Sequence, residues 1–252
     1  KTYTFHLRDA KWSNGDAVTA ADFVFGWHRA VDPATASEYS YMLSDIGQIV
    51  NAAEIIAGEK PVTDLGVSAV DDKTLEVQLN VPVSYFLSLM YFPTFYPVNE
   101  AFYNSCADTF GTSPDTVLSN GAFKLTDYQP AATAFTLEKN PDYYVADKIA
   151  LDSLAYQVIK DSQQALMSYQ TGALDMTLLN GEQVDQVKDD PEFTSVGAGY
   201  LWYLSPNMAG VPELANENLR KAITFALDRD SITDDVLKDG SAPCYTAVPP
   251  QF

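Results

Sequence analysis

The first thirty residues constrain the fold more than any other stretch, because they specify a strand, a tight turn and a capped helix in succession. Apolar and polar residues alternate over residues 3–7, which is the period of a half-buried strand. Residues 13–16 contain Asn-Gly, and both residue types accept the left-handed backbone of a turn. Thr19, with Asp22 three residues later, can cap a helix whose apolar residues recur at helical spacing over residues 23–31. The stretch therefore predicts a small α/β layer at the start of the chain.

This stretch closely resembles the signature of the extracellular solute-binding proteins of family 5, the oligopeptide- and dipeptide-binding components of ABC importers. The resemblance rests on a strand ending in Leu-Arg, then Lys-Trp-Ser-Asn-Gly, then Val-Thr-Ala-Ala-Asp-Phe-Val. Further family-like motifs follow, among them Asn-Gly-Ala-Phe-Lys-Leu at 120–125, Glu-Lys-Asn-Pro-Asp-Tyr-Tyr at 138–144 and Ala-Leu-Asp-Arg at 226–229. The resemblance covers essentially the whole chain. These residues identify a scaffold, and nothing in the first stretch is placed to do chemistry.

The resemblance implies an α/β, periplasmic-binding-protein-like fold (class II, family 5) with mixed sheets flanked by helices. Family members run considerably longer on both sides of these 252 residues, so the sequence is interpreted as an excised fragment. Three parts are expected. Residues 1–98 form an accessory α/β domain, residues 99–204 form part of the first large lobe, and residues 205–252 form the start of the second large lobe.

Periodicity and turn chemistry predict the elements within these parts. Residues 67–70 and 74–81 are expected to form a hairpin, because the second run alternates strictly between apolar and polar residues. Ser162 can cap a helix that Gly172 ends. Residues 196–204 are expected to be a crossover strand, and residues 218–229 a helix with a core-facing apolar stripe. Because strands and helices alternate in residues 99–204, a mixed or parallel sheet is expected there.

Charge and cysteine content narrow the function classes. The chain has 34 acidic and 15 basic residues, a net charge of −19, which repels nucleic acid and anionic lipid headgroups. Such a surface favours solubility outside the cell and suits a neutral or cationic ligand. No apolar run approaches the length of about 18 residues typical of a transmembrane helix. Cys106 and Cys244 are predicted to be unpaired, buried thiols, with a single long-range disulfide left as the alternative.

The sequence contains few residues in the patterns typical of catalytic or metal-binding sites. The only histidines, His6 and His28, have no cysteine, histidine or carboxylate at ligand spacing, so neither a metal site nor a cofactor is predicted. The common hydrolase, nucleotide and dinucleotide motifs are missing from the sequence. Aromatic residues stand out instead: 15 Tyr, 13 Phe and 3 Trp. Tyrosines beside loops can line a ligand site or fill a core, and the sequence leaves both open.

The candidate site residues come from the resemblance. Relatives hold an extended peptide between two lobes, bind its backbone through hydrogen bonds and salt bridges, and leave its side chains in hydrated pockets. The positions of this chain that match the contact positions are Tyr39, Ser162, Leu178, Asn180, Tyr203 and Ser205. Ser162 and Ser205 stand where the best-known oligopeptide binder has acids, and Leu178 stands where it has a tyrosine. The resemblance therefore does not fix the length or charge of the ligand.

The sequence as a whole predicts a binding protein rather than an enzyme. We expect the extracytoplasmic substrate-binding protein of an ABC importer, either periplasmic or a cell-surface lipoprotein. Its expected partners are a peptide and the permease subunits in the membrane, without nucleic acid, and exposed sheet edges favour self-association. Three alternatives remain: the same fold with an oligosaccharide, nickel chelate or haem as ligand, a peptide-signal receptor without transport, and a secreted hydrolase.

Overall fold

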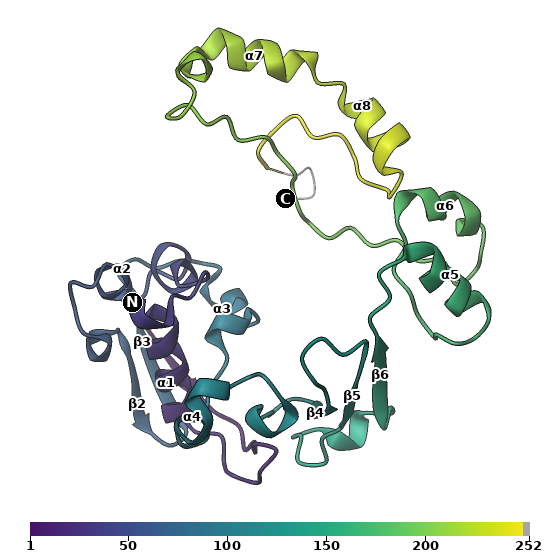
Figure 1. The fold of residues 1–252 in the computed structure, drawn as a ribbon. Helices are drawn as coiled ribbons and strands as arrows, with labels where there is room; N and C mark the ends of the chain where they lie inside the picture. Colours follow the sequence, from purple (N-terminus) through teal and green to yellow (C-terminus); the bar gives the residue numbers. More distant parts are fainter. Residues whose placement is uncertain (249–252) are drawn as a thin grey trace. The chain divides into compact units, whose positions relative to one another are not determined.

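The computed structural model describes residues 1–248, and the chain forms two compact units (Figure 1). Unit 1 runs from Lys1 to Val158, and unit 2 begins at Ile159. The strands of unit 1 are β1 (Thr2–His6), β2 (Val67–Asp71), β3 (Thr74–Gln78), β4 (Phe123–Asp127), β5 (Ala134–Lys139) and β6 (Ser153–Gln157). Its α-helices are α1 (Ala20–Val31), α2 (Ala52–Ile56), α3 (Phe86–Leu89) and α4 (Glu100–Cys106). The α-helices of unit 2 are α5 (Ser162–Gln170), α6 (Gly181–Val187), α7 (Glu217–Ala226) and α8 (Arg229–Ser231).

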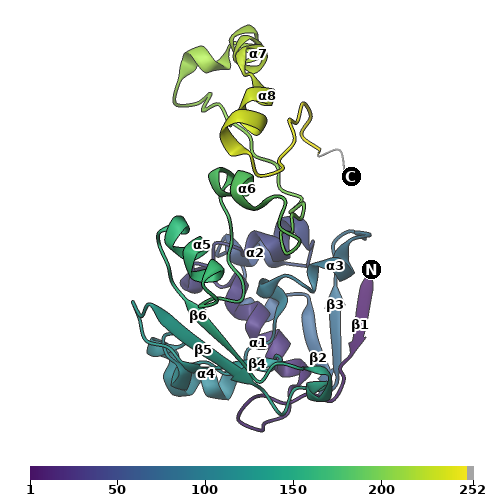
Figure 2. The same cartoon turned by 90° about the vertical axis from the view of Figure 1, so that its right-hand side faces the viewer.

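The first sheet of unit 1 has the order β1-β3-β2, and both of its pairings are antiparallel (Figure 2). Tyr3 lies opposite Val77 and Phe5 lies opposite Leu75, so the apolar residues of both strands share one face. This face packs on the core, while Thr2, Thr4 and His6 point to solvent. The predicted hairpin is therefore confirmed, although β3 ends at Gln78, earlier than the predicted residue 81.

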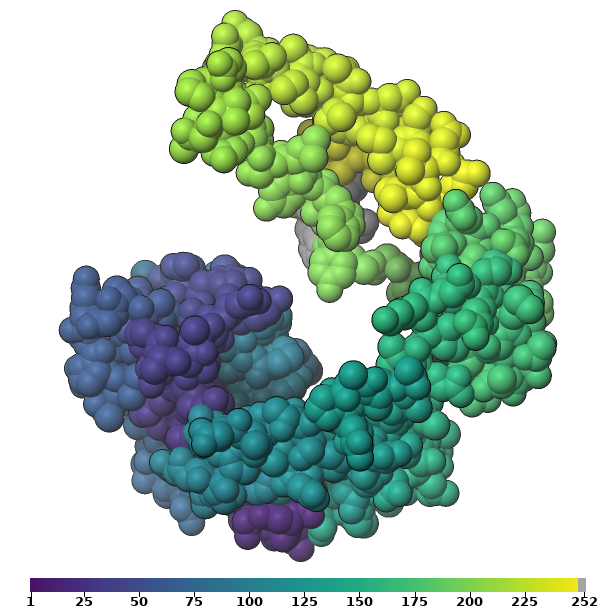
Figure 3. All heavy atoms as spheres, in the orientation of Figure 1, coloured from purple at the N-terminus to yellow at the C-terminus, as the bar shows by residue number. Residues whose placement is uncertain are grey.

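Helix α1 holds the centre of this core. The Trp27 side chain is fully buried, its Nε1–H donates to the Phe95 carbonyl at 3.0 Å, and the two rings meet edge to face at 5.3 Å. At Gly26, a Cβ atom would lie only 2.9 Å from the Tyr96 carbonyl oxygen. Glycine thus allows α1 to approach residues 96–98 closely. In Figure 3 the atoms of this region are coloured purple to blue and form one continuous surface.

The predicted helix start is confirmed at Thr19. Thr19 is the N-cap of α1 and forms a capping box with Asp22. The buried Asp22 carboxylate accepts from the Thr19 backbone N–H at 2.8 Å and from the Trp12 Nε1–H at 3.1 Å. The Trp12 side chain is itself only 3% exposed. The Asp22 carboxylate therefore connects the start of α1 with the buried Trp12 side chain, which lies next to the turn.

The second sheet of unit 1 has the order β4-β5-β6, and its pairings are also antiparallel. The Phe135 and Tyr156 rings stack across the strands at 4.7 Å. The alternation of strands and helices in residues 99–204 does not lead to parallel pairing here, because helices α5 and α6 follow β6 rather than crossing between strands. No α-helix lies between consecutive strands of this sheet, so each loop leads straight to the neighbouring strand and the pairing is antiparallel.

Unit 2 contains little core within the described residues. Ala165 and Leu166 of α5 are its buried apolar residues. The predicted strand at residues 196–204 is wrong, since this segment has no regular structure and no described segment supplies hydrogen-bond partners for it. The predicted helix at 218–229 forms as α7, although it ends at Ala226, and its apolar stripe is not buried: Leu219 and Ile223 are 39% and 40% exposed.

The division into three parts at residues 98 and 204 stays a prediction, while the separation into compact units falls after Val158. Within the described residues, no helix combines the length and the apolar character needed to cross a membrane.

Candidate functional site

Tyr39 lies in an aromatic cluster on the surface of unit 1. Its ring centroid is 5.2 Å from that of Phe92 and 6.0 Å from that of Tyr41. Phe92 packs against the core, whereas Tyr39 and Tyr41 are 49% and 42% exposed. We call Tyr39, Tyr41 and Phe92 the aromatic ladder. The sequence identified Tyr39 by resemblance, but it gave no signal that Phe92 lies beside it.

Ser162 and Asn180 come together in unit 2, although 18 residues separate them. The Asn180 Nδ2–H donates to the Ser162 hydroxyl at 3.0 Å, and the buried Gln183 side chain donates to the Ser162 carbonyl at 2.7 Å. Asn180 caps α6 and forms a capping box with Gln183. These contacts join the start of α5 to the start of α6.

Ser162 itself is not the helix cap that the sequence predicted. The N-cap of α5 is Asp161, whose carboxylate accepts from the Gln164 backbone N–H at 2.7 Å. Aspartate at this position satisfies a free N–H group and places negative charge at the positive end of the helix dipole. Ser162 is therefore the first helical residue, and its hydroxyl is left to contact Asn180.

The remaining predicted residues of unit 2 lie in segments without regular structure. The side chains of Leu178 and Tyr203 are 87% and 77% exposed, and Ser205 is exposed as well. Trp202, beside Tyr203, is 88% exposed. The structure thus brings Ser162 and Asn180 together. Leu178 is close to Asn180 in sequence but has no contact with this pair among the hydrogen bonds of the described residues. Tyr39 belongs to the other unit. Their common role in ligand binding stays a prediction.

A charged cavity of about 480 Å³ lies in unit 1, and none of the six predicted residues lines it. It is lined by Asp9, Ala10, Lys11, Ala17, Lys73, Pro141 and Asp142. Its lysines are paired: Lys11 lies 3.6 Å from the Asp142 carboxylate and Lys73 lies 3.4 Å from the Asp9 carboxylate. Surface pairs of this kind contribute little stability or binding energy.

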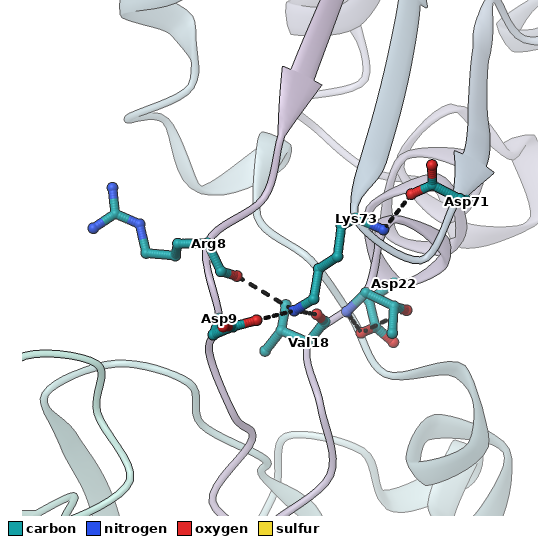
Figure 4. A network of polar contacts seen from close by, with 7 residues as sticks. Arg8, Asp9, Val18, Asp22, Asp71 and Lys73 are labelled. Carbon is teal, nitrogen blue, oxygen red and sulfur yellow. Dashed lines mark hydrogen bonds and ion pairs between the residues drawn. The ribbon is translucent and has the colours of Figure 1, made fainter.

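Lys73 also connects the two segments that flank the predicted turn. Its ammonium group donates to the backbone carbonyls of Arg8 and Val18 at 3.4 and 3.3 Å (Figure 4). Its own backbone N–H donates to the Asp71 carboxylate at 2.8 Å and lowers the pKa of that carboxyl group. Lys73 therefore has a structural role. Its contacts with Arg8 and Val18 could not be predicted from local periodicity, because these residues are distant in sequence.

The two histidines and the two cysteines lie on different segments of the chain. His6 is exposed on β1, and His28 lies on α1, where burial lowers its pKa against the weaker opposing effect of Glu100. Its Nε2 atom is buried without a hydrogen-bond partner. Cys106 and Cys244 are free thiols, and each is partly rather than fully buried, unlike the prediction. In the part of the chain that the structure describes, no group of three His, Cys, Asp or Glu side chains could hold a metal ion.

The chain matches a known protein family and several named relatives. The family model described as "Bacterial extracellular solute-binding proteins, family 5 Middle" matches residues 1–252. The chain is 38% identical over 261 residues to the periplasmic oligopeptide-binding protein OppA of Salmonella typhimurium, covering 99% of this chain and 46% of the relative. It is also 38% identical over 257 residues to the oligopeptide-binding protein OppA of Bacillus subtilis, with the same coverage.

A solved structure shows the same architecture. Listeria monocytogenes OppA bound to peptide matches with a TM-score of 0.81 and 40% identity, over 98% of this chain and 49% of that one. The agreement confirms the predicted α/β periplasmic-binding-protein fold. The chain spans about half the length of the curated relatives it matches.

Proposed function

The chain belongs to the bacterial extracellular solute-binding proteins of family 5, and from this membership we propose that the whole protein is the extracytoplasmic peptide receptor of an ABC importer. The observation that carries the proposal is the likeness to a peptide-bound relative, Listeria monocytogenes OppA, at 40% identity over nearly the entire chain. A relative from Salmonella typhimurium is named as a periplasmic oligopeptide-binding protein. The family description and the name of this relative support a location outside the cytoplasm, which we propose is either the periplasm or, for a lipoprotein, the cell surface.

The proposed mechanism is binding without covalent chemistry. The peptide lies extended between two lobes, and its main chain supplies most of the affinity, as when a strand is added to a sheet edge. Hydrated pockets then accept varied side chains, because bridging waters rearrange at little cost. Closure of the lobes around the peptide presents the loaded protein to the permease subunits.

Six residues are proposed to contribute to the peptide site. Tyr39 and Tyr203 offer apolar rings with polar hydroxyls, and a ligand can reach both because they are 49% and 77% exposed. The other four are Ser162, Leu178, Asn180 and Ser205. Ser162 and Asn180 already hold each other by a hydrogen bond, which fixes the orientation of both side chains before a peptide arrives.

Calorimetry on the intact protein with short peptides of graded length tests the proposal. Peptide binding with a dissociation constant in the micromolar range or tighter is expected, with no hydrolysis of the peptide during the titration. Binding of an oligosaccharide, a nickel chelate or haem, with no peptide binding up to high micromolar concentration, would contradict the proposal. The protein would then have the same fold and a different ligand. Release of cleaved peptide would instead identify a hydrolase.

A further inference from the structure

A second hollow of unit 1, of about 170 Å³, lies beside helix α1. The polar side chains that line it include Arg29, Thr35, Ser37 and Thr94, and Arg29 is the one charged residue of the lining. We call this feature the Arg29 hollow. Pockets that hold drug-sized molecules measure about 300–1,000 Å³, so the Arg29 hollow suits a ligand the size of a small ion.

Two aromatic rings hold the Arg29 guanidinium in place. It lies 4.1 Å from the centroid of the Tyr103 ring and 5.6 Å from that of the Phe110 ring. These two rings meet edge to face at 5.2 Å. Attraction to the rings fixes the position of the guanidinium but supplies no acceptor oxygen to its five N–H donors.

The Arg29 side chain forms no hydrogen bond or ion pair with any of the described residues, although it is partly buried. Of the other three arginines, Arg220 and Arg229 donate to backbone carbonyls at 2.9 Å. Arg8 also lies over a ring without such a bond, but it is exposed, so water satisfies its donors. Arg29 thus combines partial burial with a full set of unused donors.

The hydroxyl groups that share the hollow with Arg29 are also unused. Within residues 1–248, the side-chain hydroxyls of Thr35, Ser37 and Thr94 take part in no hydrogen bond. Tyr96 is different, because its hydroxyl already donates to the Tyr91 carbonyl at 2.9 Å. Each of the three hydroxyls can donate one hydrogen bond, so the hollow gathers more donors than it has acceptors to use them.

The acids closest to these residues in sequence do not line the hollow. The Asp32 carboxylate accepts from the Ala34 backbone N–H at 2.9 Å. Glu38 and Glu100 are exposed, and neither pairs with Arg29 in the described structure. A guanidinium without a carboxylate partner attracts an oxyanion, because two oxygens of one ion match its parallel N–H groups.

We propose that the Arg29 hollow binds a small oxyanion, which is a phosphate or a carboxylate group. Two of its oxygens accept from the Arg29 guanidinium, and the hydroxyls of Thr35, Ser37 and Thr94 donate to it. Tyr103 and Phe110 are positioning residues that hold the guanidinium. This site goes beyond the proposed peptide-binding function and does not depend on it.

Calorimetry on the intact protein tests the site with sodium phosphate and sodium acetate as probes. The ionic strength is held at about 0.15 M with sodium chloride, so that the long-range repulsion from the net charge of −19 is screened equally throughout. We expect one oxyanion to bind with a dissociation constant of about 1 mM. Tighter binding of phosphate would identify a phosphate site, and tighter binding of acetate a carboxylate site.

Substitutions assign the binding to the hollow. Arg29→Met keeps the apolar stem and removes the donors, so affinity should fall at least about tenfold. Arg29→Lys keeps the charge but loses the paired N–H groups, and should fall about threefold. Arg8→Met is the matched control, since Arg8 also lies over a ring, is exposed and does not line the hollow. It should leave the affinity unchanged.

The double variant Ser37→Ala/Thr94→Val keeps the guanidinium and its rings, so it tests the site even where the Arg29 variants fold poorly. Its affinity should fall by about threefold or more, because two donors are lost. No binding of either probe up to about 20 mM would overturn the proposal. So would equal losses in Arg29→Met and Arg8→Met, and Arg29 would then serve only the last turn of α1, where the helix dipole favours a cation.

Discussion

Residues 1–98 and unit 2 differ in how their amphipathic segments are used. In the first region, the apolar faces of β1, β3 and α1 meet one another and enclose a core that includes Trp27, Phe86 and Phe95. In unit 2, α7 has an equally clear apolar face, yet none of its residues is buried within the described structure. The comparison teaches that periodicity specifies an element, whereas burial depends on a partner surface from elsewhere in the chain.

The largest effect is expected from Trp27→Ala in the first region. The substitution removes a fully buried ring and the hydrogen bond to the Phe95 carbonyl, so the free energy of unfolding should fall by about 3–5 kcal/mol. Urea denaturation followed by far-UV circular dichroism measures it. A loss below about 1 kcal/mol would mean that this core does not dominate the stability of unit 1.

Asp22→Ala is expected to cost about 2 kcal/mol, because it removes the acceptor for the Thr19 backbone N–H and leaves the Trp12 indole N–H buried without a partner. The same denaturation experiment applies. Asp45→Ala is the control, since Asp45 is exposed and its side chain takes part in no hydrogen bond of the described residues. Equal losses for both variants would contradict the role given to the capping box.

Within unit 2, Asn180→Ala should cost about 1 kcal/mol by removing the cap of α6 and its hydrogen bond to Ser162. Hydrogen exchange read by mass spectrometry should show faster exchange in α6 and at the start of α5, with residues 1–98 unchanged. Ser162→Ala keeps the cap and should therefore affect α6 less. Exchange that rises across both units would show that they unfold together.

Acidification should destabilise the first region through His28. Burial holds the pKa of this imidazole below its ordinary value of 6.5, so the unfolded chain binds the proton more readily than the folded one. The contribution of neutral His28 is thus complete above pH 6.5 and declines as the pH falls below it. Comparing denaturation curves of the native sequence and His28→Gln across this range isolates the slope, which should be shallower in the variant.

The smallest effect is expected from Phe225→Ser on α7. The Phe225 ring is 86% exposed, so the change in unfolding free energy should stay within about 0.5 kcal/mol. A much larger loss in the intact protein would show that another part of the protein covers the apolar face of α7. Thermal denaturation of the two proteins side by side is sufficient.

The elements of the first region were predictable because each depends on neighbours close in sequence. The alternation of residues 3–7, the capping pair Thr19 and Asp22, and the turn at Asp71 each fix their own geometry. Long-range relations were less accessible. The ammonium group of Lys73 bonds to Val18, 55 residues away, and no periodicity records such a contact.

The failures in unit 2 have the same physical origin. Residues 196–204 have the composition of a strand, but a strand exists only when another segment pairs with its backbone. For the candidate site, the sequence could predict which residues belong to it but not how they contact one another. Resemblance pointed to Tyr39 and Asn180, while the ring of Phe92 beside Tyr39 and the bond between Ser162 and Asn180 needed three-dimensional positions.

The three tryptophans give the molecule two built-in optical reporters. A water-soluble quencher such as acrylamide reaches the indole of Trp202, which is 88% exposed, and is kept from Trp12 and Trp27, which are 3% and 0% exposed. The quenchable part of the emission therefore follows the segment around Trp202, and the protected part follows the integrity of the core around α1. Acrylamide quenching of the intrinsic fluorescence can therefore distinguish a change around Trp202 from global unfolding in a single unlabelled sample.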